Sequence, residues 1–296
     1  MADPKFTASS NLATHASADS DDRIPRILVF IPAYNCEKQI ARVVAQFTPD
    51  IQRLVDCVTV IENRSTDGTL DAARAALAQV LPPDRYLLLR NRQNNGLGGS
   101  HKVAFNLALD NGFTHLIVLH GDDQGSIADL VPFLQNGAFL QWDCLLGGRF
   151  MRGSSLEGYS MTRTVLNRAC NLVFSAITLR DVRDLGAGLN MYRVAAFQDR
   201  KYLNFVNSLS FNQVLLLYSI AARHRMRFFP LTWREADQIS NVRMARMGVQ
   251  LARNVMSFVF ARQKLLDSDN SGVARLDYGF DRIAGQALQA AAHAAA

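Results

Sequence analysis

Short unbroken runs of apolar residues recur through the first half of the chain, each flanked by polar residues or proline. Continuous apolar runs of this kind are typical of β-strands that are buried on both faces of a sheet. The runs that predict strands are Ile27 to Ile31, Cys57 to Ile61, Tyr86 to Leu89, Leu116 to Leu119 and a weaker run from Asp143 to Leu146.

Segments with helical periodicity separate these runs. Ser65 or Thr66 is a candidate N-cap for the second helix, and Ser126 for the fourth. The alternation of strands and helices predicts an α/β domain with a largely parallel sheet. The helical segments are Glu37 to Phe47, Thr69 to Val80, Gly99 to Asn111 and Ile127 to Leu134.

The pattern changes after Phe150, where a loop rich in Gly and Ser begins. We expect a disordered leader over residues 1–23, one domain over 24–240, and an amphipathic helical extension with a frayed Ala-rich tail over 241–296. The predicted elements of this half are helices near Arg163 to Thr178, Ser210 to Arg223 and Met247 to Leu266, a turn at Gly186 to Gly188, and a strand near Arg227 to Trp233.

Composition is that of a folded globular protein, because 49% of the 296 residues are hydrophobic and 20% are charged. The formal net charge is +6, and most of the excess lies between Arg223 and Lys264. A basic region indicates an anionic partner, which is a nucleic acid, a phosphorylated substrate or an acidic lipid surface. A solvated basic face is the alternative.

The four cysteines lie too far apart in sequence for a zinc or redox pair, and two of them fall in predicted core strands, which fits a reducing compartment. The leader lacks the apolar segment of a secretory signal. The best candidate for a membrane span, Leu203 to Ala222, holds too many Asn and Ser residues. We therefore expect a cytoplasmic chain without its own anchor, with peripheral binding at the inner face of the membrane as an open alternative.

Polar or glycine-rich segments follow each of the first four strands. Ligands bind beyond the carboxyl ends of the strands in open α/β sheets, so four such segments in succession predict a ligand site. The segments are Pro32 to Glu37, Glu62 to Thr69, Asn94 to Gly99 with Lys102 in the next helix, and His120 to Gln124.

The order of these segments resembles that of the family 2 glycosyltransferases of GT-A fold, and within them the dolichyl- and polyprenyl-phosphate sugar synthases. Their Pro-x-Tyr-Asn, Asp-Asp-Gly-Ser-x-Asp-Gly-Thr, Asn-x-Gly-x-Gly…Arg and Asp-x-Asp-x-Gln motifs match the four segments in order. The resemblance covers about residues 26–245 and implies a Rossmann-like, mostly parallel sheet flanked by helices. Later matches are Gly147 to Arg149, Arg183 to Arg193, Pro230 to Glu235 and Ser240 with Asn241.

The resemblance also implies a divalent ion, Mg²⁺ or Mn²⁺, that offsets negative charge on the leaving diphosphate of a nucleotide sugar. Asp122 is the expected ligand. His120 replaces the first Asp of the motif, and it either binds the metal, bonds to the diphosphate or only supports the site. Asp123 is expected to face solvent or the acceptor. The expected nucleotide-binding residues are Pro32, Tyr34, Glu37, Glu62, Asn63, Gly98, Lys102 and Gly121.

On the acceptor side, the resemblance places Arg183, Asp184 and Arg234 near a phosphate, and Arg149 is a further phosphate partner. Val214 stands where the family often has Glu, which leaves no obvious general base except Asp184. A hydroxyl acceptor needs a base, whereas a phosphate monoester is already ionised at pH 7. The substitution therefore favours a phosphate acceptor.

These observations predict an inverting glycosyltransferase that uses a polyprenyl phosphate, dolichyl or undecaprenyl, with Asp122, Asp184 and Arg183 as its catalytic residues. The alternatives are transfer to a saccharide or protein hydroxyl and a non-catalytic protein that binds nucleotide sugars. A nucleic-acid partner is disfavoured because no binding motif is present. The helix Met247 to Leu266 either lies in a membrane interface or packs on the domain or a second subunit, and a membrane-anchored partner is a further option.

Overall fold

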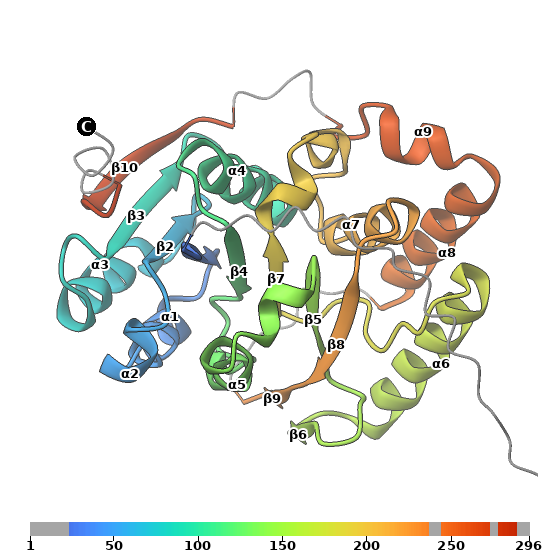
Figure 1. The fold of residues 1–296 in the computed structure, drawn as a ribbon, viewed down its shortest axis with the longest axis horizontal. Helices are drawn as coiled ribbons and strands as arrows, with labels where there is room; N and C mark the ends of the chain where they lie inside the picture. The colour runs from blue at the N-terminus through green and yellow to red at the C-terminus, as the bar shows by residue number, and fades with distance from the viewer. Residues whose placement is uncertain (1–23, 237–243, 273–277, 289–296) are drawn as a thin grey trace, which may run out of the picture.

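The computed structural model describes residues 24–236, 244–272 and 278–288. An eight-stranded mixed sheet in the order β10-β3-β2-β1-β4-β7-β5-β8 forms its centre (Figure 1). The predicted leader, the Ser240–Asn241 match and the end of the Ala-rich tail lie outside the described residues.

Four neighbouring strands of this sheet, β3, β2, β1 and β4, run parallel, and β8 runs parallel to β5. Strands β7 and β10 are antiparallel to their neighbours. A second sheet pairs β6 (Ser155–Glu157) with β9 (Thr232–Arg234). The strands of the main sheet are β1 Ile27–Ala33, β2 Cys57–Glu62, β3 Tyr86–Asn91, β4 His115–Leu119, β5 Cys144–Gly148, β7 Leu189–Arg193, β8 Met226–Pro230 and β10 Phe280–Gly285.

Helices cover both faces of the sheet, and the alternation of side chains along β1 shows why. Leu28 and Phe30 point into one core, whereas Val29 and Ile31 point into the other. The first core is closed by α4 (Gly96–Asp110), α6 (Met161–Thr178), α7 (Phe211–Ala221), α8 (Met244–Phe260) and α9 (Arg262–Asp267). The second is closed by α1 (Glu37–Ala45), α3 (Thr69–Val80), the short α5 (Val131–Gln135), and the 3₁₀ turns η1 (Ile127–Leu130) and η2 (Ala138–Gln141).

The structure confirms the five strands and the α/β class predicted from the first half. It corrects three details of the pattern. The helix expected from Ile127 is a 3₁₀ turn, capped by Ser126 as predicted, and then α5. Gly68, rather than Ser65 or Thr66, occupies the N-cap of α3. The helix expected over Met247 to Leu266 is divided at Ala261 into α8 and α9.

Two strands of the sheet were missed, and each has a physical reason. Strand β7 contains a buried asparagine, Asn190, which is tolerated because its amide accepts the Gly147 N–H and donates to the Ala187 carbonyl. Strand β10 lies at the sheet edge, so Asp281 and Arg282 stay exposed and break the apolar pattern. The segment expected to be a helical extension therefore returns a strand to the sheet.

In the described part of the chain, none of the helices combines the length and the hydropathy that a membrane span requires.

Candidate active site

Backbone strain gathers at the carboxyl ends of three central strands. The non-glycine residues Asn35, Arg64 and Asp123, which follow β1, β2 and β4, have φ values of 50°, 62° and 59°. Left-handed backbone is uncommon outside glycine and concentrates at functional sites. Three other described non-glycine residues share this conformation (Leu179, Arg200 and Arg223), but only this edge of the sheet brings three of them to the ends of neighbouring strands.

The end of β1 presents an exposed aromatic ring. Tyr34 is 45% exposed, and Pro32 beside it is half-buried. The Pro32 carbonyl accepts the Gly121 N–H at 3.1 Å, and a Cβ at Gly121 would lie only 2.7 Å from that oxygen. A glycine at this position thus lets the end of β4 lie against the end of β1, beside Tyr34.

The loop after β2 is held in place by acidic side chains. Glu37 Oε2 accepts the Gly68 N–H at 3.1 Å, and Asp67 Oδ1 accepts the Thr69 N–H at 3.1 Å. The Asn35 side chain accepts the Thr66 N–H at 2.9 Å. The structure therefore places Glu37 against the loop, where it fixes the backbone beside Tyr34.

Glu62 and Asn63 lie beneath this edge with their polar atoms already engaged. Glu62 is fully buried, accepts the Ser65 N–H and forms an ion pair with Arg90 at 2.9 Å between Oε2 and Nε. Asn63 Oδ1 accepts the Asn91 amide at 2.8 Å and the backbone N–H of Asn95 at 2.9 Å. Both side chains join the end of β2 to the end of β3.

Lys102 is turned into the protein. Its ammonium donates to the Phe205 carbonyl, to Asn207 Oδ1 at 2.8 Å and to the Tyr278 hydroxyl at 2.9 Å. These three acceptors use its three hydrogens, and burial lowers its pKa to about 8. Gly98 also contacts Asn207, because the Gly98 N–H donates to the Asn207 carbonyl at 2.9 Å. The structure thus brings neither residue to an exposed phosphate-binding position.

Asp122 and His120 follow β4 directly. Burial raises the pKa of Asp122 to about 6, and its Oδ1 accepts the Gln124 N–H at 3.3 Å. Burial, followed by the charge of Arg149, lowers the pKa of His120 to about 4, so its imidazole is neutral at pH 7. The same arginine offsets a small part of the rise that burial causes in the pKa of Asp122. The three side chains therefore belong to one electrostatic environment.

The imidazole of His120 is closely surrounded. Its ring meets that of His101 edge-on, with centroids 6.1 Å apart, and a Cβ at Gly188 would lie 2.9 Å from its Cγ. Its Nε2 is buried and makes no hydrogen bond with the described residues. A buried nitrogen without a partner is costly, so a ligand donor or a cation at this position would be favourable.

Asp123 was expected to face solvent or the acceptor, but its side chain is largely buried against α1. Its carboxylate pairs with Arg42 at 2.6 Å and accepts the Gln46 amide at 3.4 Å, both on α1. Asp123 thus combines a left-handed backbone with a carboxylate that is held by α1.

Arg149 and Asp184 form a closed pair. The guanidinium donates through Nε to Oδ2 at 2.7 Å and through Nη2 to Oδ1 at 2.8 Å. The backbone N–H groups of Arg149 and Gly186 donate to the same carboxylate, and Arg149 also lies over the Trp233 ring, 4.8 Å from its centroid. In this arrangement Arg149 is not open to a phosphate, and Asp184 is not poised to take a proton.

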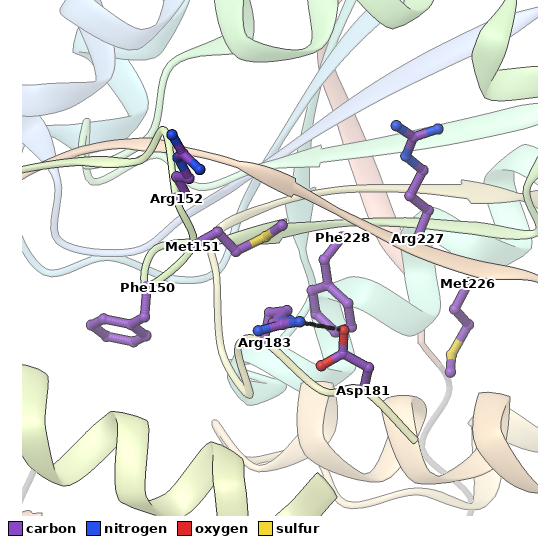
Figure 2. Close-up of a pocket in the computed structure, with 8 residues that line it drawn as sticks. All are labelled: Phe150, Met151, Arg152, Asp181, Arg183, Met226, Arg227 and Phe228. Carbon is purple, nitrogen blue, oxygen red and sulfur yellow. Dashed lines mark hydrogen bonds and ion pairs between the residues drawn. The ribbon is translucent and has the colours of Figure 1, made fainter. Parts of the chain in front are cut away.

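Arg183 and Arg234, which the resemblance placed near an acceptor phosphate, are both exposed. Arg234 pairs with Glu157 at 2.9 Å, and its N–H donates to the Gln124 carbonyl beside the β4 loop. Arg183 pairs with Asp181 at 2.7 Å. Figure 2 shows this second pair in an open pocket, with the Arg152 side chain directed away from it. The pocket has a volume of about 460 Å³ and is lined by Phe150, Met151, Arg152, Asp181, Arg183 and Met226 to Phe228.

A divalent ion fits Asp122 if the substrate supplies further ligands. Among the described residues, no three acidic, His or Cys side chains converge as a ready metal cluster. One or two carboxylates completed by phosphate and water oxygens are, however, the usual protein ligands of Mg²⁺. Burial disfavours the ionised form of Asp122, and a nearby cation would favour it. His120 Nε2 offers a nitrogen ligand, which suits Mn²⁺ better than Mg²⁺.

A family model described as "Glycosyl transferase family 2" matches residues 28–201, which is more than half of the chain. The chain belongs to this family. A polyprenol monophosphomannose synthase from Mycolicibacterium smegmatis is 25% identical over 174 residues, which are 57% of this chain and 62% of that protein. The match thus spans less than two thirds of the relative's length.

Solved structures of similar fold cover more of the chain. Glucosyl-3-phosphoglycerate synthase from M. tuberculosis superposes with a TM-score of 0.55 at 16% identity, over 89% of each chain, and it has also been solved with UDP and Mn²⁺. S. aureus TarS 1-349 in complex with UDP-GlcNAc gives a TM-score of 0.53 at 16% identity, over 84% of this chain and 68% of TarS. These similarities confirm the GT-A fold.

Sequence reasoning missed three residues that shape the site of this glycosyltransferase. Arg90, at the end of an apolar strand, neutralises Glu62, and Arg42 on α1 holds Asp123. His101, on α4, contacts the ring of His120. Arg90 could have been found from the sequence, because it is a charged residue near the end of a buried strand. The contacts of Arg42 and His101 could not, because they depend on how α1 and α4 pack.

Proposed function

We propose that this family 2 glycosyltransferase moves a sugar from a nucleotide-diphosphate sugar to a polyprenyl phosphate, such as dolichyl or undecaprenyl phosphate, with inversion at the anomeric carbon. The name of the polyprenol monophosphomannose synthase, which is 25% identical over 174 residues, supports this class of acceptor.

The pairing of carboxylates on the acceptor side is the observation that carries the proposal. In the described residues of this half, Asp184, Asp181, Glu157 and Glu235 each form an ion pair with an arginine. The position where the family often has Glu holds Val214, which is buried. Asp184, the one candidate base that the sequence left, has both of its carboxylate oxygens engaged by the Arg149 guanidinium. An acceptor phosphate is already ionised and needs no base.

The exposed arginines fit the acceptor phosphate better than the buried one. The side chains of Arg183 and Arg234 are 53% and 55% exposed, and exposed ion pairs contribute little energy. A phosphate dianion can therefore displace Asp181 or Glu157 from them. Arg149 has a buried bidentate partner, so it serves to position the loops around the site instead.

On the donor side, we assign Asp122 and His120 to a Mg²⁺ or Mn²⁺ ion and Tyr34 with Pro32 to the nucleotide. When bound, the ion would offset charge on the leaving diphosphate. The M. tuberculosis synthase solved with UDP and Mn²⁺ supports such an ion. The remaining residues predicted to bind nucleotide support the surrounding loops through the contacts described above: Glu37, Glu62, Asn63, Gly98, Lys102 and Gly121.

A transfer assay tests the proposal. The enzyme is incubated with Mg²⁺ or Mn²⁺, a panel of labelled UDP- and GDP-sugars, and undecaprenyl or dolichyl phosphate. We expect a labelled lipid product with one of the donors, its loss in Asp122→Asn, and its retention in Asp123→Asn, which changes the neighbouring carboxylate that pairs with Arg42. Nucleotide binding without transfer to any lipid phosphate contradicts the proposal and favours a non-catalytic binding protein.

A further inference from the structure

Helix α6 exposes its apolar side. Its buried residues are Thr164, Asn171 and Phe174, of which two are polar, and Asn171 donates to the Arg183 carbonyl at 2.6 Å. Large apolar side chains on α6 and directly after it are exposed instead: Met161, Val165, Leu166, Leu172, Val173, Ile177 and Leu179, with exposed fractions from 40% to 87%.

Helix α8 extends the same surface. It lies beside α6 at one end of the molecule (Figure 1), and it contacts α6 directly. Its exposed large apolar side chains are Val249, Met256, Val259 and Phe260. We call the exposed apolar residues of α6 and α8, together with Leu179, the α6–α8 face. Many large exposed apolar side chains on two helices in contact mark a site of interaction with a protein or a membrane.

The charges on these segments have one sign. Helix α6 contains Arg163 and Arg168, helix α8 contains Arg246 and Arg253, and neither helix contains Asp or Glu, although Arg163 is paired with Glu235. Arg168 and Arg253 are exposed on the helices themselves. Two copies of such a face would bring like charges together, which opposes self-association. An anionic surface with an apolar interior complements both the charge and the apolar side chains.

We propose that the α6–α8 face docks this enzyme onto an anionic lipid bilayer, with the apolar side chains inserted among the headgroups and acyl chains and the basic ones beside lipid phosphates. This surface role goes beyond the transfer reaction and does not depend on which acceptor is used. It has one consequence for the site. The chain leaves α6 at Thr178 and reaches Asp181 and Arg183 within five residues, so the pocket in Figure 2 would lie next to the membrane.

Vesicle sedimentation tests the docking without any transfer step. The full chain is mixed with phosphatidylcholine vesicles that contain about 30 mol% phosphatidylglycerol and no polyprenyl phosphate. We expect binding that weakens at high salt, and at least about a tenfold weaker partition coefficient for Leu172→Glu and Met256→Glu. Leu140→Glu is the matched control, because Leu140 is an exposed leucine of η2 on the other face of the sheet.

Results of two kinds, in vesicle binding and in light scattering, would overturn the docking. One is equal binding by Leu172→Glu and the wild type, or no binding by the wild type. The other is a wild-type dimer in light scattering that Leu172→Glu converts to a monomer, which would assign the face to self-association. Thermal unfolding of each variant shows whether it is folded. If docking fails while sugar is still transferred to lipid phosphate in detergent, only the surface role is wrong.

Discussion

Asp122→Asn removes the charge of the expected metal ligand and keeps its shape. Burial raises the pKa of Asp122 from 3.8 to about 6 in the folded protein. This difference of about 2 pKa units corresponds to about 3 kcal/mol of unfavourable ionisation at neutral pH. Asp122 is only partly buried, so about 3 kcal/mol is the upper bound of what the charge costs the folded state.

The sign of the pH dependence follows from the raised pKa. Between about pH 4 and pH 6 the folded protein binds this proton more tightly than the unfolded chain, so the contribution of Asp122 to stability falls as the pH rises through that window. Above pH 6 the loss is complete. Asn has no such loss, so the stability of Asp122→Asn should match that of the wild type near pH 4 and exceed it by up to about 3 kcal/mol at pH 7.5. For a chain of this length that difference corresponds to a Tm higher by up to about 5 °C.

Calorimetry with and without ligands checks both effects. At pH 7.5, Mn²⁺ with UDP should raise the Tm of the wild type, since ligands that bind only the folded state stabilise it, and should leave Asp122→Asn unchanged. Asp123→Asn is the control and should keep the response to Mn²⁺, because its carboxylate pairs with Arg42. The reasoning is refuted if Asp122→Asn shows no gain in Tm without ligand and a full response to Mn²⁺ and UDP.

Three further substitutions test other parts of the site. His120→Asp exchanges a nitrogen ligand for an oxygen, so the ratio of the transfer rate with Mg²⁺ to that with Mn²⁺ should rise. Asp184→Asn leaves the Arg149 guanidinium buried beside a neutral amide, and urea unfolding should show a loss of about 3–5 kcal/mol. Tyr34→Ala removes the exposed ring that we assign to the nucleotide, and calorimetric titration should show UDP binding weakened by about 1–3 kcal/mol, the range for stacking of a base on an aromatic ring.

Each of these predictions has a contradicting result and a control. An unchanged metal preference in His120→Asp would mean that the imidazole does not reach the ion. Asp184→Asn should be compared with Asp181→Asn, whose exposed ion pair contributes little, and equal stabilities would show that the buried pair is not important. UDP affinity that is unaffected in Tyr34→Ala would place the base elsewhere, and the unfolding temperature of that variant controls for folding.

The sequence predicts the strands whose apolar runs are continuous and misses strands whose runs are broken by polar residues, such as Asn190 in β7. Strands β1 to β5 were found because their apolar runs are continuous. Strand β10 was missed because its outer residues meet solvent, and its pairing with β3 joins segments nearly 200 residues apart. A local sequence pattern cannot predict the pairing of strands so far apart in the chain.

For the candidate site, the sequence predicts where residues lie but not which of them contact each other. The carboxyl-end rule was enough to locate Tyr34 and Asp122 at one edge of the sheet. Which charged groups pair with each other could not be predicted, because pairing depends on tertiary contacts. Asp184 meets Arg149 across 35 residues, and Lys102 meets the Phe205 carbonyl across 103. These contacts occupy the polar groups of Arg149, Asp184 and Lys102. From the motifs alone, the same groups had been expected to bind phosphate or to take a proton.

The most direct test compares two acceptors that differ only in the phosphate. Initial rates of sugar transfer are measured in detergent with undecaprenyl phosphate and with undecaprenol, at pH 7.5 with Mn²⁺ and the preferred donor. Because the acceptor-side carboxylates in the described residues are paired with arginines, we predict transfer to undecaprenyl phosphate and none to the alcohol. Transfer to undecaprenol at a comparable rate, or to a soluble hydroxyl acceptor in place of the lipid phosphate, would contradict the proposed function.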